Sequence, residues 1–153
     1  MFNKEFFKVG IVIFVFIADR VSKNLILNFP EYNFHWIIPG VVSINFIHNS
    51  GVAFGLLKGY NLFFIFFNTL LLGFLLLIRK KFSDFLSSLA IHFIIGGALG
   101  NIFDRIKYGY VIDFIDLKYF PAIFNIADFS ITCGAVLLVY LSIKEAREVK
   151  CSQ

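Results

Sequence analysis

The chain has 153 residues, of which 59% are hydrophobic and 16% are charged, and its mean hydropathy is +0.82. Soluble domains average about 45 to 50% apolar and about 25% charged residues, so this composition excludes an ordinary soluble domain and indicates a membrane protein. The net charge of +4 comes from basic residues scattered among apolar stretches, which leaves no clustered basic face for nucleic acid.

Four stretches predict membrane-spanning helices within one domain over residues 1–153. The clearest is 59–78, which has no charged residue and is long enough to cross a hydrocarbon core of about 30 Å. The other three are expected at about 7–28, 85–104 and 126–144. The first stretch also has features of a signal peptide, but it lacks a small-x-small cleavage site, so we expect an uncleaved helix.

Two excursions outside the membrane are expected, at residues 29–58 and 105–125. The first contains a long uncharged stretch that would pass for a fifth crossing, but Pro39 and Gly40 break it. Val42–His48 alternates with the period of two that is typical of a strand. We therefore expect a small β-rich layer on the membrane surface, with the second excursion on the same side.

Positive charge predicts the orientation of the chain. Eight basic residues flank the predicted helices on one side, and six remain for the opposite side, where most of them lie in or beside polar clusters. The eight are Lys4, Lys8, Arg79, Lys80, Lys81, Lys144, Arg147 and Lys150. The positive-inside rule then predicts that both termini are cytoplasmic and that both excursions face outward.

Five aspartates fall near the outer helix ends or in the second excursion, and an ionisable group at membrane depth costs about 2.5 to 3.5 kcal/mol on insertion scales. They are Asp19, Asp104, Asp113, Asp116 and Asp128. The apolar neighbours of Asp113 should raise its pKa. Asp128, in the first turn of the last helix, is either a helix cap or a functional acid. If the chain turns back between them, Asp113 and Asp128 can share one proton, which supplies a base and an acid for attack of water on a peptide bond.

Other polar residues allow more than one interpretation. Asp19 and Lys23 are four apart and can pair on one helix face, either as a structural ion pair or to position a substrate or lipid head group. Asp104 is expected to pair with Arg105 or to orient its neighbours. Gly96–Gly100 has the spacing that lets helices approach closely. The three histidines lack the spacing of metal ligands, so we expect no metal.

Four short blocks follow one another along nearly the whole chain. They are Asp19–Lys23 (DRVSK), Asn49–Phe54 (NSGVAF), Gly96–Arg105 (GGALGNIFDR) with Gly109–Phe114 (GYVIDF), and Phe124–Asp128 (FNIAD). In this order they resemble the lipoprotein signal peptidases, the bacterial signal peptidase II family of membrane aspartyl endopeptidases. Arg20 stands where glutamine is common in that family.

The resemblance implies an all-α polytopic membrane protein with four transmembrane helices, both termini inside, a small periplasmic β-rich layer and a second periplasmic excursion. The catalytic pair implied is Asp113 and Asp128. The resemblance and the pairing above suggest these substrate-binding or orienting residues: Asn49, Gly51, Asn101, Arg105, Asn125, Asp19 and Lys23. The implied substrate is a prolipoprotein cut before its diacylglyceryl-modified lipobox cysteine, with no metal or other cofactor. The first excursion would cradle this substrate, and the second would lie over the two aspartates.

We accordingly expect a monomer in the bacterial inner membrane, in contact with lipid, with its active site at the outer face and with sensitivity to globomycin. A small proton-coupled transporter is the alternative, because intramembrane acids can relay protons. Four crossings are few for a transporter, and the sequence has no internal repeat of the kind found in many of them. A purely structural membrane module would leave the buried position expected for Asp113 without a purpose.

Overall fold

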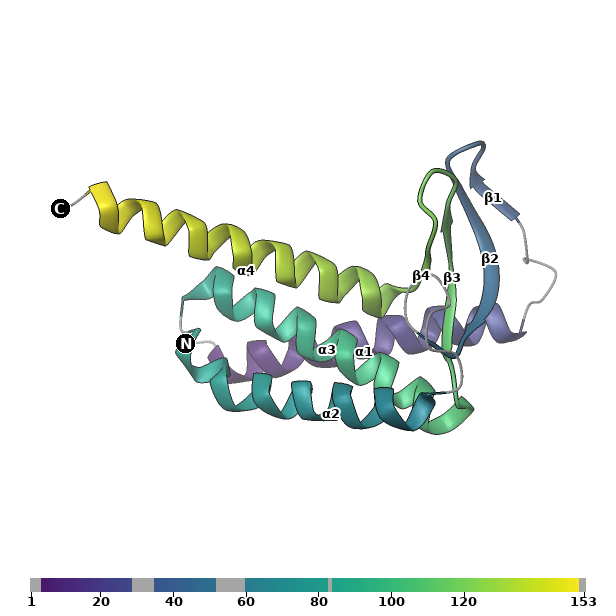
Figure 1. Ribbon diagram of the computed structural model, residues 1–153, viewed down its shortest axis with the longest axis horizontal. Coiled ribbons are helices and arrows are strands. Elements are labelled where there is room, and N and C mark those ends of the chain that lie inside the picture. The colour runs from purple at the N-terminus through teal and green to yellow at the C-terminus, as the bar shows by residue number, and fades with distance from the viewer. Residues whose placement is uncertain (1–3, 29–34, 52–59, 83, 152–153) are drawn as a thin grey trace.

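The computed structural model describes residues 4–28, 35–51, 60–82 and 84–151. Long helices run side by side, and a small sheet stands across one end of them (Figure 1). The elements are α1 (Lys4–Asn28), β1 (His35–Ile38), β2 (Val42–Asn49), α2 (Asn61–Ile78), a short 3-10 turn (Arg79–Lys81), α3 (Phe85–Tyr108), β3 (Val111–Leu117), β4 (Ile123–Phe124) and α4 (Ile126–Cys151).

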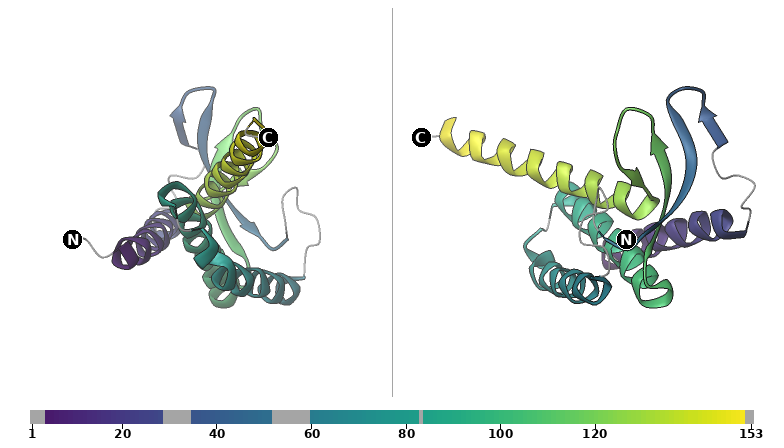
Figure 2. Two further views of the ribbon diagram at one scale, coloured as in Figure 1. Left: turned by 90° about the vertical axis from the view of Figure 1, so that its left-hand side faces the viewer. Right: turned by 45° about the vertical axis from the view of Figure 1, so that its right-hand side comes forward.

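α3 is the central helix of the bundle. It packs against α1, α2 and α4, and the end-on view in Figure 2 shows it between them. A Cβ built on Gly96 would lie 2.8 Å from Cβ of Val15 in α1, and one on Gly97 would lie 2.5 Å from the carbonyl oxygen of Ala127 in α4. The expected close approach of helices at these small residues is therefore confirmed. It brings polar residues of α1, α3 and α4 close to one another.

Three helices of the described chain are long and apolar enough to cross a membrane, and they span Asn61–Lys81, Phe85–Tyr108 and Ile126–Glu148. α2 exposes most of its large apolar side chains and α4 exposes several, which include Phe129, Val136 and Val139, as lipid-facing helices do. α1 is 25 residues long but is not among these three, and it carries charged residues near both ends. Its crossing of the membrane stays a prediction.

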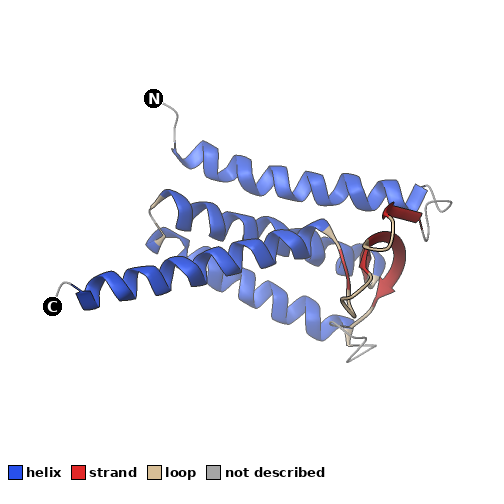
Figure 3. Ribbon diagram, turned by 90° about the horizontal axis from the view of Figure 1, so that it is seen from above, coloured by secondary structure: helices blue, strands red, loops and turns tan. Residues whose placement is uncertain are grey.

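The sheet has the order β1-β2-β3-β4, and every neighbouring pair is antiparallel. The strand expected at Val42–His48 is confirmed as β2. The second excursion was expected as a separate segment, but its strands β3 and β4 complete the same sheet, because Asn49 pairs with Val111 and Ile115 pairs with Phe124. Figure 3 shows this single layer at one end of the helices.

Two helices end later in the chain than expected. α3 continues to Tyr108 and ends where Gly109 adopts the left-handed conformation, with φ of 81°. Arg105 therefore lies on a helix instead of in the second excursion. α4 continues to Cys151, well beyond residue 144. An apolar cluster of Ile26, Ile112 and Phe114 fixes the sheet against the end of α1.

Candidate active site

Asp113 lies on β3 and is almost completely buried, with 1% of its surface exposed. Both of its carboxylate oxygens accept a hydrogen bond from a side-chain amide. Asn49 Nδ2 donates to Oδ2 at 2.8 Å, and Asn125 Nδ2 donates to Oδ1 at 2.6 Å. These two donors come from β2 and from the start of α4, so two segments other than β3 fix the orientation of this carboxyl group.

Asp128 lies in the first turn of α4, but it is not the cap of that helix. Asn125 is the cap, because its Oδ1 accepts a hydrogen bond of 2.8 Å from the backbone N–H of Asp128. The carboxylate of Asp128 instead accepts a hydrogen bond of 2.7 Å from Nδ2 of Asn101 on α3. The carboxylate also interacts with the backbone N–H of Asn125, so Asp128 contributes to the capping of α4 as its third residue and lines the candidate site as well.

Asp113 and Asp128 line the same cavity, which has a volume of about 370 Å³. The chain between them turns back through β3 and β4, as expected from the intervening residues. The polar end of the cavity also includes Asn49, Gly51, Asn101 and Arg105. Its other walls are apolar side chains of α2, α3 and α4, which include Leu71, Leu75, Ile94 and Ile131.

Burial and the nearby charge of Asp128 raise the pKa of Asp113 from 3.8 to about 7. Burial is the larger cause, and the hydrogen bonds from Asn49 and Asn125 act in the opposite direction because they stabilise the ionised form. A carboxyl group with this pKa exchanges its proton near neutral pH. The two aspartates together can therefore hold one proton, as general acid–base chemistry requires.

Arg105 fixes the segment that follows β2. Its Nη2 donates a hydrogen bond of 2.8 Å to the carbonyl oxygen of Gly51, and its guanidinium lies 4.8 Å from the centre of the Phe64 ring. The backbone N–H of Gly51 in turn donates to Oδ1 of Asn49 at 3.1 Å. Arg105 thus supports, through Gly51, the asparagine that contacts Asp113. Residues 52–54 of the sequence block Asn49–Phe54 lie outside the described residues.

Sequence reasoning missed Asn61, at the start of α2. Its Nδ2 donates to the carbonyl oxygen of Arg105 at 3.2 Å, and its Oδ1 accepts from Nη1 of Arg105 at 3.5 Å. The signal in the sequence is an amide at the beginning of a largely apolar helix, which carries a second amide, Asn68, in the wall of the cavity. Asp116, by contrast, accepts a hydrogen bond of 3.2 Å from Asn45 and does not line the cavity.

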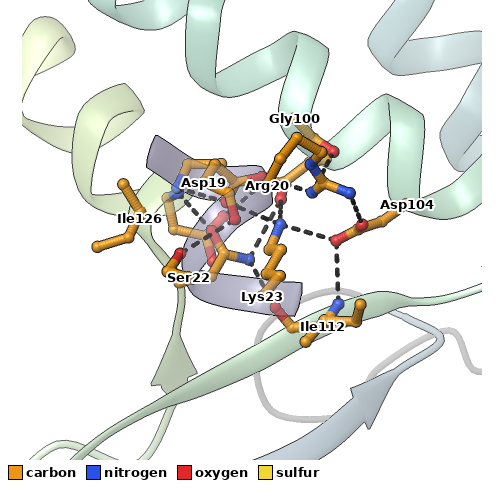
Figure 4. Close-up of polar contacts among 12 residues, drawn as sticks. Asp19, Arg20, Ser22, Lys23, Gly100, Asp104, Ile112 and Ile126 are labelled. Carbon is orange, nitrogen blue, oxygen red and sulfur yellow. Dashed lines mark hydrogen bonds and ion pairs between the residues drawn. The ribbon is translucent and has the colours of Figure 1, made fainter. Parts of the chain in front are cut away.

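A buried cluster of ions lies between α1 and α3 (Figure 4). Lys23 Nζ lies 2.9 Å from Oδ1 of Asp19 and 2.7 Å from Oδ2 of Asp104, and it donates to Oδ1 of Asn101 at 3.1 Å. The expected pair between Asp19 and Lys23 is therefore present. Asp104 binds Arg20 and Lys23, and the pair expected with the adjacent Arg105 is not formed.

No group of three or more histidine, cysteine, aspartate or glutamate side chains within the described ranges could hold a metal ion. The candidate site is instead built from carboxylates, side-chain amides and two kinds of cation. This donor set suits proton transfer and the binding of a peptide backbone.

Comparison with known proteins shows the family of this chain and agrees with its fold. A family model described as signal peptidase (SPase) II matches residues 11–144. A lipoprotein signal peptidase of Caldicellulosiruptor bescii is 39% identical over 138 residues, which cover 90% of this chain and 91% of that protein. One of Syntrophomonas wolfei is 41% identical over 143 residues, which cover 90% and 93%.

A solved structure described as a bacterial membrane enzyme superposes with a TM-score of 0.85 at 34% identity and covers 91% of this chain and 88% of that one. A second structure described in the same way gives a TM-score of 0.82, also at 34% identity. Together with the match over residues 11–144, these similarities show that the chain belongs to the signal peptidase II family.

Proposed function

We propose that this protein is a membrane aspartyl endopeptidase that removes the signal peptide from prolipoproteins, by cutting on the N-terminal side of a diacylglyceryl-modified lipobox cysteine. The observation that carries the proposal is the meeting of Asp113 and Asp128 in one cavity, each held by a side-chain amide. Membership in the signal peptidase II family supports the substrate class.

The proposed reaction uses the two carboxyl groups in opposite protonation states. The ionised carboxylate takes a proton from water while the water oxygen attacks the scissile carbonyl carbon. The protonated carboxyl donates a hydrogen bond to the carbonyl oxygen. When the tetrahedral intermediate collapses, the C–N bond breaks and the leaving amine takes a proton from the carboxyl that received it from water. No metal or organic cofactor takes part in this proposal.

The apolar part of the cavity suits a signal peptide. Its apolar lining comes from three helices, with Leu71 and Leu75 on α2, Ile94 on α3 and Ile131 on α4. An apolar helical segment can lie in such a groove between helices without leaving the hydrocarbon layer. Its scissile bond would then reach the aspartates at the polar end. Membrane lipid is the medium from which this substrate enters.

The proposed topology has four crossings, with both termini in the cytoplasm of a bacterial cell and the site at the outer face of the inner membrane. α1 starts and α4 ends at the end of the bundle away from the sheet, and the basic turn Arg79–Lys81 lies there too (Figure 1). Positive charge at that end agrees with a cytoplasmic location. α1 exposes large apolar side chains between its charged ends, which include Ile13, Phe14 and Ile17. A monomer contains all residues of the proposed site.

Cleavage of a diacylglyceryl-cysteine lipobox peptide by the purified chain in lipid tests the proposal. Asp113→Asn and Asp128→Asn should each abolish turnover, while Asp116→Asn, a matched change on the same strand as Asp113, should retain it. If the folded wild type leaves both the lipidated and the unlipidated peptide intact, the peptidase proposal fails. Proton flux in vesicles would then test the transporter alternative.

A further inference from the structure

The buried ion cluster consists of two acids and two bases, namely Asp19, Arg20, Lys23 and Asp104. Asp19 and Asp104 are completely buried, Lys23 is 1% exposed, and the Arg20 side chain is 17% exposed. Such a cluster is expensive to bury, and replacing buried ion pairs with apolar residues is often neutral or stabilising. Stability alone therefore gives little reason for this arrangement in a membrane protein.

Each acid of the cluster also accepts a hydrogen bond from the backbone. Asp19 Oδ1 accepts from the N–H of Ala127 at 3.1 Å, and Asp104 Oδ2 accepts from the N–H of Ile112 at 3.2 Å. Ala127 directly precedes Asp128 in the chain, and Ile112 directly precedes Asp113. The two acids of the cluster thus hold the two backbone segments that carry the proposed catalytic aspartates.

Arg20 joins these two acids through one planar group. Its Nη1 donates to Oδ1 of Asp104, and its Nη2 donates to Oδ2 of Asp19 and, at 3.1 Å, to the carbonyl oxygen of Gly100 (Figure 4). The guanidinium lies 4.7 Å from the centre of the Phe103 ring, which fixes its plane on one side. A rigid fork held in this way sets the separation of the two carboxylates.

Lys23 contacts the same two acids through their other oxygens, but it cannot replace Arg20. With Arg20 removed, two carboxylates would share one buried ammonium group, and the cluster would carry an uncompensated negative charge. A buried charge of this kind must take up a proton, recruit water or move apart from its neighbour. Each response would disturb the acceptors of the Ile112 and Ala127 amides.

We propose that Arg20 is a positioning residue, which clamps Asp19 to Asp104 and so fixes the separation of the backbone segments that carry Asp113 and Asp128. The inference rests on the proposed function for its catalytic consequence. Displacing reacting groups by about 1 Å can lower a rate by about 100-fold. A residue that touches no substrate atom can therefore act on turnover through this geometry.

The experiment compares Arg20→Met and Arg20→Lys with a matched control, Lys107→Met. Lys107 is a second cation beside the same ring, with Nζ 5.6 Å from the centre of Phe103, and it is exposed at the end of α3. Residue-resolved hydrogen exchange of the Ile112 and Ala127 amides is measured in lipid, together with kcat and KM for the lipidated peptide.

Arg20→Met should speed exchange at both amides by about tenfold, because their charged acceptors are no longer fixed. It should lower kcat by about 100-fold with KM within about twofold of the wild type. Arg20→Lys should be intermediate, since a single ammonium group cannot bind both acids as a fork does. Lys107→Met should match the wild type in every readout.

The inference is overturned if Arg20→Met, or Arg20→Lys where the methionine variant does not fold, lowers thermal stability but leaves exchange at Ile112 and Ala127 and kcat unchanged. Exchange is independent of catalysis, so the two proposals can fail separately. A wild type that folds and does not cleave refutes the proposed function alone. A wild type that cleaves while its Arg20 variants keep normal exchange and kcat refutes this inference alone.

Discussion

Asn125 donates a hydrogen bond of 2.6 Å from Nδ2 to Oδ1 of Asp113, and the same side chain caps the helix that carries Asp128. One amide therefore links the strand and the helix on which the two aspartates lie. Its Nδ2 also lies within hydrogen-bonding distance of Oδ1 of Asn101 and of the carbonyl oxygen of Ile112, at 3.2 and 3.3 Å. These contacts make Asn125, which is fully buried, the centre of the polar site.

Replacing Asn125 with alanine should lower kcat by about 100-fold, because the positions of both carboxyl groups depend on this side chain. Loss of the cap should also lower the free energy of unfolding by about 1 kcal/mol. Steady-state kinetics and thermal unfolding in detergent measure the two effects. Asn45→Ala is the control, since it removes an asparagine–aspartate hydrogen bond at Asp116, away from the cavity. Equal losses of kcat in both variants would contradict the central position of Asn125.

Activity should depend on pH because Asp113 and Asp128 share one proton. Burial and the charge of Asp128 raise the pKa of Asp113 to about 7, so one proton on the pair is lost as the pH rises through that value. Cleavage needs one protonated carboxyl group, and kcat/KM should therefore fall above about pH 7. Measuring kcat/KM between about pH 5 and pH 9 tests this fall in activity. A rate that is still constant at about pH 9 would show that the proton of the pair is not required.

The same raised pKa predicts a change in stability. The folded state binds the Asp113 proton more tightly than the unfolded state, whose carboxyl titrates near 3.8. Stability should therefore fall as the pH rises from about 4 to about 7, and the full penalty should be present above that range. Asp113→Asn removes the titrating group while keeping its size. Its Tm should exceed that of the wild type at about pH 8, and the difference should shrink at about pH 5. An unchanged difference at the two pH values would contradict the raised pKa.

Gly100 tests how closely α1 and α3 must approach at the ion cluster. A Cβ built there would lie 2.6 Å from Oδ2 of Asp19, so Gly100→Ala must displace this acid. Alanine is favoured over glycine within a helix by about 1 kcal/mol, so helix propensity alone predicts a gain in stability. The close contact should outweigh that gain, and both Tm and kcat should fall.

Gly73→Ala on α2 is the control, because a Cβ there meets no atom within 4 Å, and its Tm should stay or rise. A stabilising effect of Gly100→Ala would show that the helices separate easily at this point.

Features carried by short stretches of sequence could be predicted, whereas those that depend on distant partners could not. The alternation at Val42–His48 gave the strand β2, and the spacing of four gave the contact between Asp19 and Lys23. The pairing of Asn49 with Val111, which joins the two excursions into one sheet, has no local signal.

The partners of Asp104 are a second feature that could not be predicted from neighbouring residues in the sequence. Its neighbour Arg105 was expected as a partner, but consecutive residues of a helix point about 100° apart. Asp104 faces Arg20 and Lys23 on α1, and Arg105 faces Gly51. The packing of α1 against α3 therefore determines which cations pair with Asp104. The same packing gives Arg20 a set of contacts that the sequence did not suggest.

Two adjacent leucines on α2 test whether the apolar part of the cavity holds the signal peptide. Leu71 lines the cavity that contains Asp113 and Asp128, whereas Leu70 lies on another side of the helix and is 62% exposed. Leu71→Trp should fill part of the groove and raise KM by about tenfold or more, because a bulky ring competes with the substrate for the same space. Leu70→Trp adds the same ring on the lipid side and should leave KM unchanged. If both variants behave alike, the signal peptide does not lie between α2 and α4, and its path to the aspartates must be sought along another helix.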